Sequence, residues 1–290
     1  MIKAVVVDMD GTLLDDKHQI SENTVSVIKQ FQKEGGAFVV NTGRSYLSAS
    51  KILKGAGISC DCICMSGAAI YNEDGNCVWK DTMKESEIAI VRELERKYCL
   101  FVNYITSRGV CTECSYDIAK AHYLYEVRTL ARLKNKIIDE AEEIKKYDWI
   151  LNMLQFETDI DQLLKDGTDI YKMTVMSMDA EILKITKEAF NNYPSLVAVN
   201  TFPTNFEVNA SRVDKGFATM QYISDKGFIP EEVMVIGDSE NDSAMFKEPF
   251  GKKVAMENAS EEIKKMCTDI TASNIEEGVA FAILKWALKD

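Results

Sequence analysis

Histidine is scarce in this sequence, and its scarcity excludes two common catalytic strategies. The 290 residues include only two histidines, His18 and His122. Because Ser–His–Asp and Cys–His mechanisms use a histidine as general base, we expect neither of them here. Neither histidine lies at zinc-ligand spacing from the isolated Cys111-x-x-Cys114 pair. We therefore interpret the alternating cysteines over residues 60–64, and Cys111 and Cys114, as small buried hydrophobic residues.

Positive charge and long apolar runs are also lacking. Lysine and arginine number 34 against 46 acidic residues, which gives a net charge of −12. Nucleic-acid-binding proteins usually carry a basic face, so we expect no nucleic-acid partner. No segment is long and apolar enough to span a membrane, and residues 1–4 lack the parts of a signal peptide. We therefore expect a cytoplasmic protein of about two domains, without a membrane partner.

The first chemically suggestive stretch is an apolar run over residues 4–7 that leads directly into Asp8 and Asp10. Such a continuous run predicts a strand buried on both faces of a parallel sheet. Gly11 breaks this strand, so both carboxylates lie at the sheet edge where ligands of open α/β sheets bind. Two crowded acids repel each other, and a bound Mg²⁺ would relieve that repulsion. The alternative is a solvated acidic turn after an ordinary strand.

Further apolar runs alternate with segments of helical periodicity. The runs cover residues 37–40, 60–65 and 233–236, and each ends in polar residues. Alternating strands and helices predict parallel strands joined by right-handed crossovers. Residues 84–204 differ, because charged amphipathic helices and alternating strands predict a half-solvated sheet there.

These patterns predict an α/β fold of two parts. We expect a Rossmann-like parallel-sheet core over residues 1–83 and 205–290, which includes a short strand at 206–208. An inserted α+β cap domain is expected over residues 84–204.

The carboxyl ends of parallel strands meet at one edge of a sheet, and here they carry polar clusters. The residues expected there are Asp8, Asp10, Thr42, Gly43, Arg44, Asp238, Asn241 and Asp242. Lys215 begins a helix expected in the same domain. Several carboxylates, a hydroxyl, an ammonium and exposed amides suit a phosphoryl group bound beside Mg²⁺.

Geometry assigns a role to each carboxylate. Asp8 lies at the rigid end of its strand and could attack phosphorus, forming an aspartyl-phosphate. Asp10 lies across the turn, where it could protonate the leaving oxygen and then accept a proton from water. Asp8 and Asp238 could ligate the metal. Four simpler roles remain open, namely a helix cap for Thr42, a surface position for Lys215, a helix first-turn acid for Asp242 and a salt bridge for Arg44.

The motifs resemble those of the haloacid dehalogenase superfamily, and in particular its Cof-type branch. The DxDGTL motif corresponds to residues 8–13, the TGR motif to 42–44, the KG pair to 215–216 and the GDxxND motif to 237–242. Late signatures at 254–259 and 273–280 are also similar. The branch often has Asn-Gly-Ala where this chain has Ser66-Gly67-Ala68, which puts one outer-sphere or substrate contact in doubt.

The resemblance implies a phosphatase that depends on Mg²⁺, with Asp8 as nucleophile and Asp10 as general acid and base. Its implied metal ligands are the Asp8 side chain, the Asp10 carbonyl oxygen and Asp238, with Asp242 as a further candidate. Phosphate or substrate contacts are implied for Thr42, Lys215 and Asn241, to which we add Gly43 and Arg44.

We expect the substrate to be a small phosphorylated metabolite, a sugar phosphate or similar, with its specificity set by the cap. The cap residues that could reach it are Tyr104, Arg108, Tyr116 and His122, although packing in the core is the simpler role for each. A phosphomutase with the same intermediate and a non-catalytic phospho-signalling module are alternatives.

Overall fold

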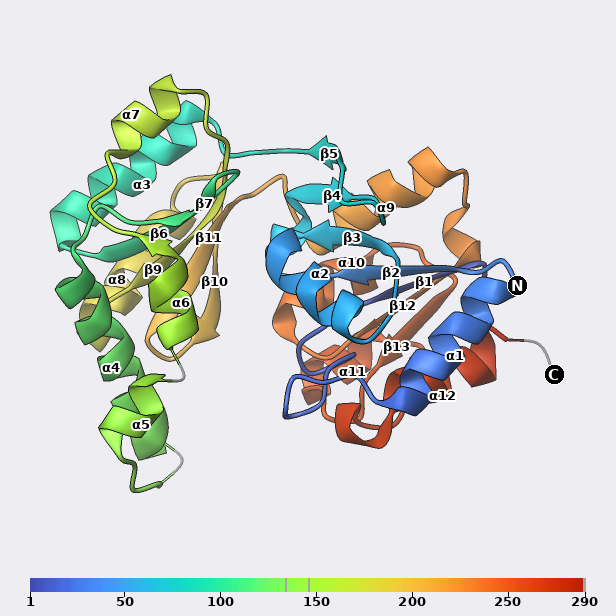
Figure 1. The fold of residues 1–290 in the computed structure, drawn as a ribbon. Helices are drawn as coiled ribbons and strands as arrows, with labels where there is room; N and C mark the ends of the chain where they lie inside the picture. The colour runs from blue at the N-terminus through green and yellow to red at the C-terminus, as the bar shows by residue number, and fades with distance from the viewer. Residues whose placement is uncertain (134, 146, 289–290) are drawn as a thin grey trace. The chain divides into compact units, whose positions relative to one another are not determined.

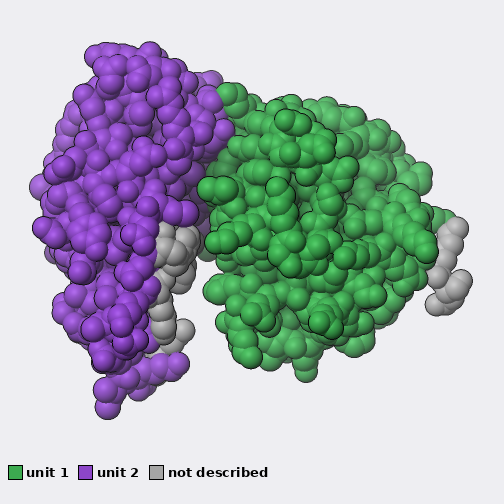
Figure 2. Space-filling view, in the orientation of Figure 1, with its two compact units in different colours: residues 1–81, 213–290 green, residues 82–212 purple. Residues whose placement is uncertain are grey.

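A computed structural model describes residues 1–133, 135–145 and 147–288 (Figure 1). The chain forms two compact units, which Figure 2 shows in different colours. Unit 1 comprises Met1–Asp81 and Val213–Asp290, and unit 2 comprises Thr82–Arg212. In the part of the chain that the structure describes, no helix has the length and apolar character needed to cross a membrane.

Unit 1 is built on an eight-stranded sheet with the order β14-β13-β12-β1-β2-β3-β4-β5. The strands from β14 to β3 pair in parallel, whereas β4 and β5 add an antiparallel hairpin at one edge. The strands are β1 (Ala4–Val7), β2 (Ala37–Asn41), β3 (Asp61–Cys64), β4 (Ala69–Tyr71), β5 (Cys77–Lys80), β12 (Val233–Gly237), β13 (Lys252–Ala255) and β14 (Asp269–Ile270). The predicted α/β fold with a parallel sheet is therefore confirmed.

Helices cover both faces of this sheet because its central strands are apolar on both sides. Every residue of β1 is buried, and its alternate residues Ala4 and Val6 pack in one core cluster with α9, α10 and α11. Helices α1, α2 and α12 lie over the other face (Figure 1). The helix bounds are α1 (Glu22–Lys33), α2 (Tyr46–Gly55), α9 (Lys215–Lys226), α10 (Ser243–Lys247), α11 (Glu261–Met266) and α12 (Gly278–Trp286).

Strand register brings distant parts of the sequence to one sheet edge. Val7, the last residue of β1, pairs with Val40 of β2 and with Ile236 of β12. Asp8 therefore leaves β1 directly beside the ends of both neighbouring strands. The three loops that follow these strands meet at the carboxyl edge, where ligands of open α/β sheets bind.

Unit 2 has its own six-stranded sheet with the order β10-β11-β9-β6-β7-β8, antiparallel except for the β7–β8 pair. One core cluster packs one sheet face against α3, α7 and α8, and a smaller cluster includes α4 and α6. Its elements are α3 (Glu85–Tyr98), β6 (Phe101–Thr106), β7 (Gly109–Cys111), α4 (Tyr116–Leu133), α5 (Glu140–Lys145), α6 (Asp148–Met153), β8 (Leu154–Gln155), α7 (Ile160–Lys165), β9 (Ile170–Met176), α8 (Ala180–Asn191), β10 (Leu196–Phe202) and β11 (Asn205–Ala210).

One strand lies in a different unit from the one that the sequence predicts. The segment 206–208 was expected in the core, but it is part of β11, which pairs with β9 and β10 in unit 2. The unit boundaries accordingly fall after Asp81 and after Arg212, rather than after residues 83 and 204. The prediction was wrong here because apolar alternation identifies a strand but does not identify its partner.

Candidate active site

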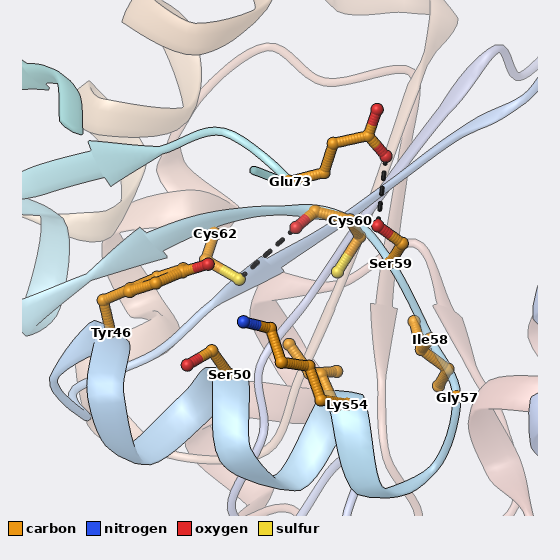
Figure 3. A pocket seen from close by; sticks show the side chains of 10 residues that line it. Tyr46, Ser50, Lys54, Gly57, Ile58, Ser59, Cys60, Cys62 and Glu73 are labelled. Atoms are coloured by element: carbon orange, nitrogen blue, oxygen red, sulfur yellow. Dashed lines mark hydrogen bonds between the residues drawn. The ribbon is translucent and has the colours of Figure 1, made fainter. Parts of the chain in front are cut away.

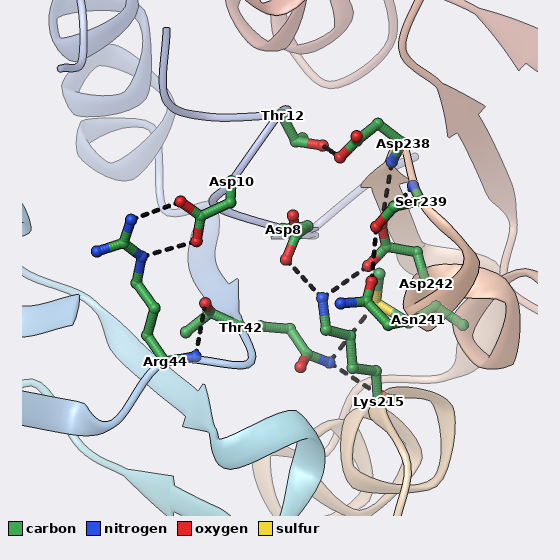
Figure 4. A network of polar contacts seen from close by, with 12 residues as sticks. Asp8, Asp10, Thr12, Thr42, Arg44, Lys215, Asp238, Ser239, Asn241 and Asp242 are labelled. Carbon is green, nitrogen blue, oxygen red and sulfur yellow. Dashed lines mark hydrogen bonds and ion pairs between the residues drawn. The ribbon is translucent and has the colours of Figure 1, made fainter. Parts of the chain in front are cut away.

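The centre of the site is a buried ion cluster around Lys215, the first residue of α9 (Figure 4). Its Nζ donates to Oδ1 of Asp8 at 2.5 Å and to Oδ1 of Asp242 at 2.7 Å. Lys215 is only 1% exposed, Asp8 3% and Asp242 0%. The surface role left open for Lys215 is therefore wrong, because its ammonium is enclosed between two carboxylates.

Burial and like charges determine the electrostatics of this cluster. Burial raises the pKa of Asp8 well above its usual range, and the nearby Lys215 ammonium opposes that rise. Burial alone would lower the pKa of Lys215, but Asp242 and Asp8 outweigh it and raise that pKa. One lysine thus faces several carboxylates, which leaves an excess of negative charge.

Asp238, which follows β12, completes the acidic group. The Thr12 hydroxyl donates to Asp238 Oδ1 at 2.8 Å. Burial raises the pKa of Asp238 to about 6, although the Thr12 bond opposes the shift. Side-chain oxygens of Asp8, Asp238 and Asp242 lie within 4.8 Å of one another. This all-oxygen donor set, with two buried members, a half-buried Asp238 and excess negative charge, fits Mg²⁺, which prefers carboxylate oxygens and would lower the cost of crowding them.

Gly11 allows the first loop to approach Asp238. It has φ +80°, and a Cβ at this position would lie 2.5 Å from Asp238 Oδ2. Both features exclude larger residues, since a side chain would strain the backbone and also displace a carboxylate of the cluster.

Asp242 is held by donors of the chain on both of its oxygens. Oδ1 accepts from Lys215, and Oδ2 accepts from the backbone N–H groups of Asp238 and Ser239 at 3.0 and 3.1 Å. Asp242 thereby fixes both the ammonium and the loop that carries Asp238. Its neighbour Asn241 is exposed, and Asn241 Oδ1 accepts from the Ser239 hydroxyl at 2.8 Å.

Asp10 forms a separate pair with Arg44 at the rim of the site (Figure 4). Arg44 Nε donates to Asp10 Oδ2 at 2.7 Å, and Nη2 donates to Oδ1 at 2.5 Å. The hydrogen bonds that Arg44 donates to this carboxylate raise the pKa of Arg44. The structure thus shows Arg44 in the salt bridge that was left open for it, and a fork of this kind holds a carboxylate firmly in place.

Thr42 and Gly43 follow β2 at the same sheet edge. Thr42 is 1% exposed, and its hydroxyl oxygen accepts from the Arg44 backbone N–H at 3.1 Å. The N-cap of α2 is Ser45, whose side chain accepts from the Ser48 N–H. The capping role left open for Thr42 is therefore wrong, and its hydroxyl hydrogen can point to another acceptor.

Sequence reasoning missed residues that hold the loops rather than line the site. Asn41, fully buried at the end of β2, donates through Nδ2 to the Lys215 carbonyl and to the Thr219 hydroxyl, both at 2.9 Å. Asn258 donates to the Gly11 carbonyl at 2.8 Å and accepts from the Asn274 N–H. For Asn258 and Asn274, the available sequence signal was that both lie in the late signatures. For Asn41, it was an amide side chain directly after an apolar run that predicts a strand.

The backbone conformation at Ser66 gives a physical reason why asparagine is common at this position of the Asn-Gly-Ala pattern. It has φ 58° and ψ 31°, which is the left-handed region of backbone conformation. Asparagine enters this region more readily than serine does, because its short amide side chain can hydrogen-bond locally. The position therefore selects a backbone shape, and serine adopts that shape at a small cost.

Ser66→Asn should accordingly stabilise the protein by about 0.5 kcal/mol, since it favours the conformation already present. Urea unfolding measures the change. Ser26→Asn, at an exposed position within helix α1, is the control and should give no gain. A stability gain equal in both variants would show that the backbone conformation at position 66 is not the cause.

Of the cap residues proposed to reach substrate, two are packing residues. Tyr104 is fully buried and donates a hydrogen bond to Glu95. His122 is 7% exposed and stacks on Phe101 with ring centroids 4.9 Å apart. The simpler packing role is therefore the one observed for both.

Arg108 and Tyr116, the other two candidates, lie at the surface of unit 2. Arg108 donates to the Asp166 carbonyl at 3.3 Å. Tyr116 is 44% exposed and contacts the Phe156 ring edge to face.

Known proteins resemble this chain along almost its whole length. Residues 5–283 match the haloacid dehalogenase-like hydrolase family. The Bacillus subtilis (strain 168) protein named 5-amino-6-(5-phospho-D-ribitylamino)uracil phosphatase YcsE is 30% identical, covering 99% of this chain and 96% of its own. Phosphatase YwpJ of the same strain is 28% identical, and the match covers 96% of this chain and 98% of YwpJ. A solved haloacid dehalogenase-like hydrolase from B. subtilis has a TM-score of 0.82 at 25% identity. The match covers 99% of this chain and 100% of the solved chain.

The chain belongs to the haloacid dehalogenase-like hydrolase family. Its motifs, its fold and its phosphatase relatives place it in the Cof-type branch as a phosphoric monoester hydrolase. The resemblance inferred from the sequence motifs is therefore confirmed.

Proposed function

We propose that this enzyme is a Mg²⁺-dependent phosphatase that hydrolyses a small phosphorylated metabolite through an aspartyl-phosphate intermediate. The observation that carries the proposal is the buried contact between Asp8 and Lys215 inside a group of three carboxylates. A carboxylate held rigidly at a strand end beside an ammonium suits attack on a phosphoryl group.

Mg²⁺ would be held by the side chains of Asp8 and Asp238 and by the carbonyl oxygen of Asp10. Asp242 belongs to the same acidic group, but both of its oxygens already accept hydrogen bonds, so we assign it mainly to positioning. When bound, the ion neutralises charge on the phosphoryl oxygens and orients the phosphate. The remaining chemistry falls to residues of the chain.

In the first step an Asp8 oxygen forms a bond to phosphorus, and the bond from phosphorus to the substrate oxygen breaks. Asp10 gives a proton to that leaving oxygen, so an alcohol departs. In the second step Asp10 takes a proton from water as the water attacks phosphorus. The Asp8–phosphorus bond then breaks and releases inorganic phosphate. Both Asp10 oxygens accept from Arg44 in the structure, so one of these bonds would have to open while Asp10 carries the proton.

Several groups are candidates for contacting the phosphate. Lys215 places positive charge beside Asp8, and the Thr42 hydroxyl retains a hydrogen to donate. The Gly43 backbone and the exposed Asn241 amide could add further donors. Arg44 would act through Asp10, because its guanidinium is already engaged there.

We further propose that unit 2 acts as a cap that sets specificity, with a sugar phosphate or a related polyol phosphate as substrate. The relative YcsE is named for a phosphomonoester carried on a ribityl chain. That substrate belongs to the proposed class, although relatives at this level of identity can differ in their preferred leaving group.

The deciding experiment is a screen of phosphorylated metabolites with Mg²⁺ that measures free phosphate. We expect release from at least one sugar or polyol phosphate, and from para-nitrophenyl phosphate more slowly. Transfer of the phosphoryl group to a sugar hydroxyl without phosphate release would indicate a mutase. Phosphate binding without turnover of any ester would contradict the proposal.

Asp238→Ala should raise the Mg²⁺ concentration needed for half-maximal activity by roughly 100-fold, because it removes a metal ligand from the site. A magnesium titration of phosphate release measures the shift. Glu240→Ala, an exposed acid two residues further on, is the matched control and should leave the titration unchanged. An unshifted titration in Asp238→Ala would remove this residue from the metal site.

A further inference from the structure

A cavity of about 250 Å³ lies between α2 and β3, away from the cluster around Asp8 (Figure 3). None of its lining residues belongs to the phosphoryl site described above. The lining residues that matter here are Tyr46, Ser50, Lys54, Cys60, Cys62 and Glu73. Two thiols, one ammonium and one carboxylate therefore line a single cavity that is open to solvent on one side.

The thiols come from the alternating cysteines at the start of β3. Residues two apart in a strand point to the same face, so the side chains of Cys60, Cys62 and Cys64 form one row. Cys60 is 8% exposed at the cavity, Cys62 is 1% exposed, and Cys64 is fully buried at the end of the row. The Cys62 thiol donates to the Cys60 carbonyl at 3.7 Å (Figure 3).

The sulfurs also interact with one another. Hydrogen bonds from the Cys60 and Cys64 thiols lower the pKa of Cys62 to about 5. The same interactions raise the pKa of Cys60 and of Cys64, with burial adding to the rise. Two thiols on one strand face that line the same cavity are groups that soft metal ions select once they are deprotonated.

Other cysteines of the described chain lack this arrangement. Cys111 and Cys114 have metal-ligand spacing in the sequence, but they pack in different core clusters of unit 2. Cys77 and Cys99 are exposed at the surface. The pair formed by Cys60 and Cys62 combines neighbouring thiols with a cavity large enough for an ion and its water.

We propose that this cavity binds one soft d¹⁰ metal ion, of the Cu⁺ or Zn²⁺ kind, through the sulfurs of Cys60 and Cys62. Binding forms two metal–sulfur bonds and releases the thiol protons, without electron transfer. Water in the cavity would complete the coordination of an ion that takes more than two ligands. Hard Mg²⁺ prefers oxygen donors, so the two proposed sites select different ions.

The test is a titration of the full chain with Cd²⁺ at saturating Mg²⁺, followed by ultraviolet thiolate-to-cadmium charge-transfer absorption. This absorption reports sulfur ligation, so a Cd²⁺ ion bound by carboxylates is silent. We expect saturation of a tight component at one ion per chain. Cys60→Ser and Cys62→Ser should each weaken that component by roughly 100-fold or more, because each removes a ligand.

Cys114→Ser and Cys77→Ser are the matched controls and should leave the tight component unchanged. Absence of the absorption in the unmodified protein, or an unchanged midpoint in Cys60→Ser, would overturn the proposal. Cys62 is deeply buried, so circular dichroism must show a folded variant. If Cys62→Ser unfolds, Cys60→Ser at the cavity wall decides the outcome. No phosphatase assay is involved, so this result is independent of the proposed function.

Discussion

Asp8→Asn should reduce turnover of para-nitrophenyl phosphate by at least about 10⁴-fold, because an amide cannot replace the attacking carboxylate. The fold should remain intact, since asparagine can still accept the Lys215 hydrogen bond through its carbonyl oxygen. Phosphate release at saturating Mg²⁺ measures the loss.

The same variant should be more stable than the unmodified protein when Mg²⁺ is absent. The folded pKa of Asp8 is raised, so its ionised form costs stability at every pH above the ordinary range of an aspartate. Removing that charge removes the cost, and thermal unfolding in a metal chelator should show a higher midpoint. Asp16→Asn, at an exposed acid of the following loop, is the control and should change neither activity nor stability.

Near-normal turnover in Asp8→Asn would show that another group attacks phosphorus. If Asp8→Asn loses both its activity and its folded state, the assigned contact with Lys215 is wrong, because that buried contact should survive this change.

Lys215→Met should have the second large effect, since it removes the ammonium that contacts both Asp8 and Asp242. Removing one partner from a buried ionic group costs about 3 to 5 kcal/mol, because the remaining charges lose their compensation. Urea unfolding without metal should show that loss. Activity should also fall roughly 100- to 1000-fold as a donor to the phosphoryl oxygens disappears.

Lys226→Met provides the matched control on the same helix. Its ammonium pairs with Asp61 at the surface, with 46% of the lysine side chain exposed. Such a pair contributes at most about 1 kcal/mol, so the control should remain active and nearly as stable. An equal loss of stability in both variants would contradict the special role of Lys215. Partial recovery of the Lys215→Met stability on adding Mg²⁺ would support a shared charge cluster.

Much of the site could be predicted because its signals are local. An apolar run that ends in Asp8, and a second that ends in Gly237 and Asp238, identify buried strands and the polar residues at their ends. Parallel register then brings those ends together without further information. The residue that each side chain contacts was harder to predict from the sequence. Whether Arg44 would contact phosphate or Asp10, and whether Thr42 or Ser45 would cap α2, depends on distances that spacing alone does not give.

The sequence by itself determined the order of the strand-end motifs, the excess of carboxylates among them and the presence of an interrupted α/β core. Tertiary structure alone decided that Lys215 is enclosed between Asp8 and Asp242, and that β11 joins the sheet of unit 2. It also decided that Cys60 and Cys62 open on a cavity whereas Cys111 and Cys114 separate into different cores. The physical reason is that residue type and periodicity fix which face a side chain points to, whereas packing between distant segments fixes what it meets there.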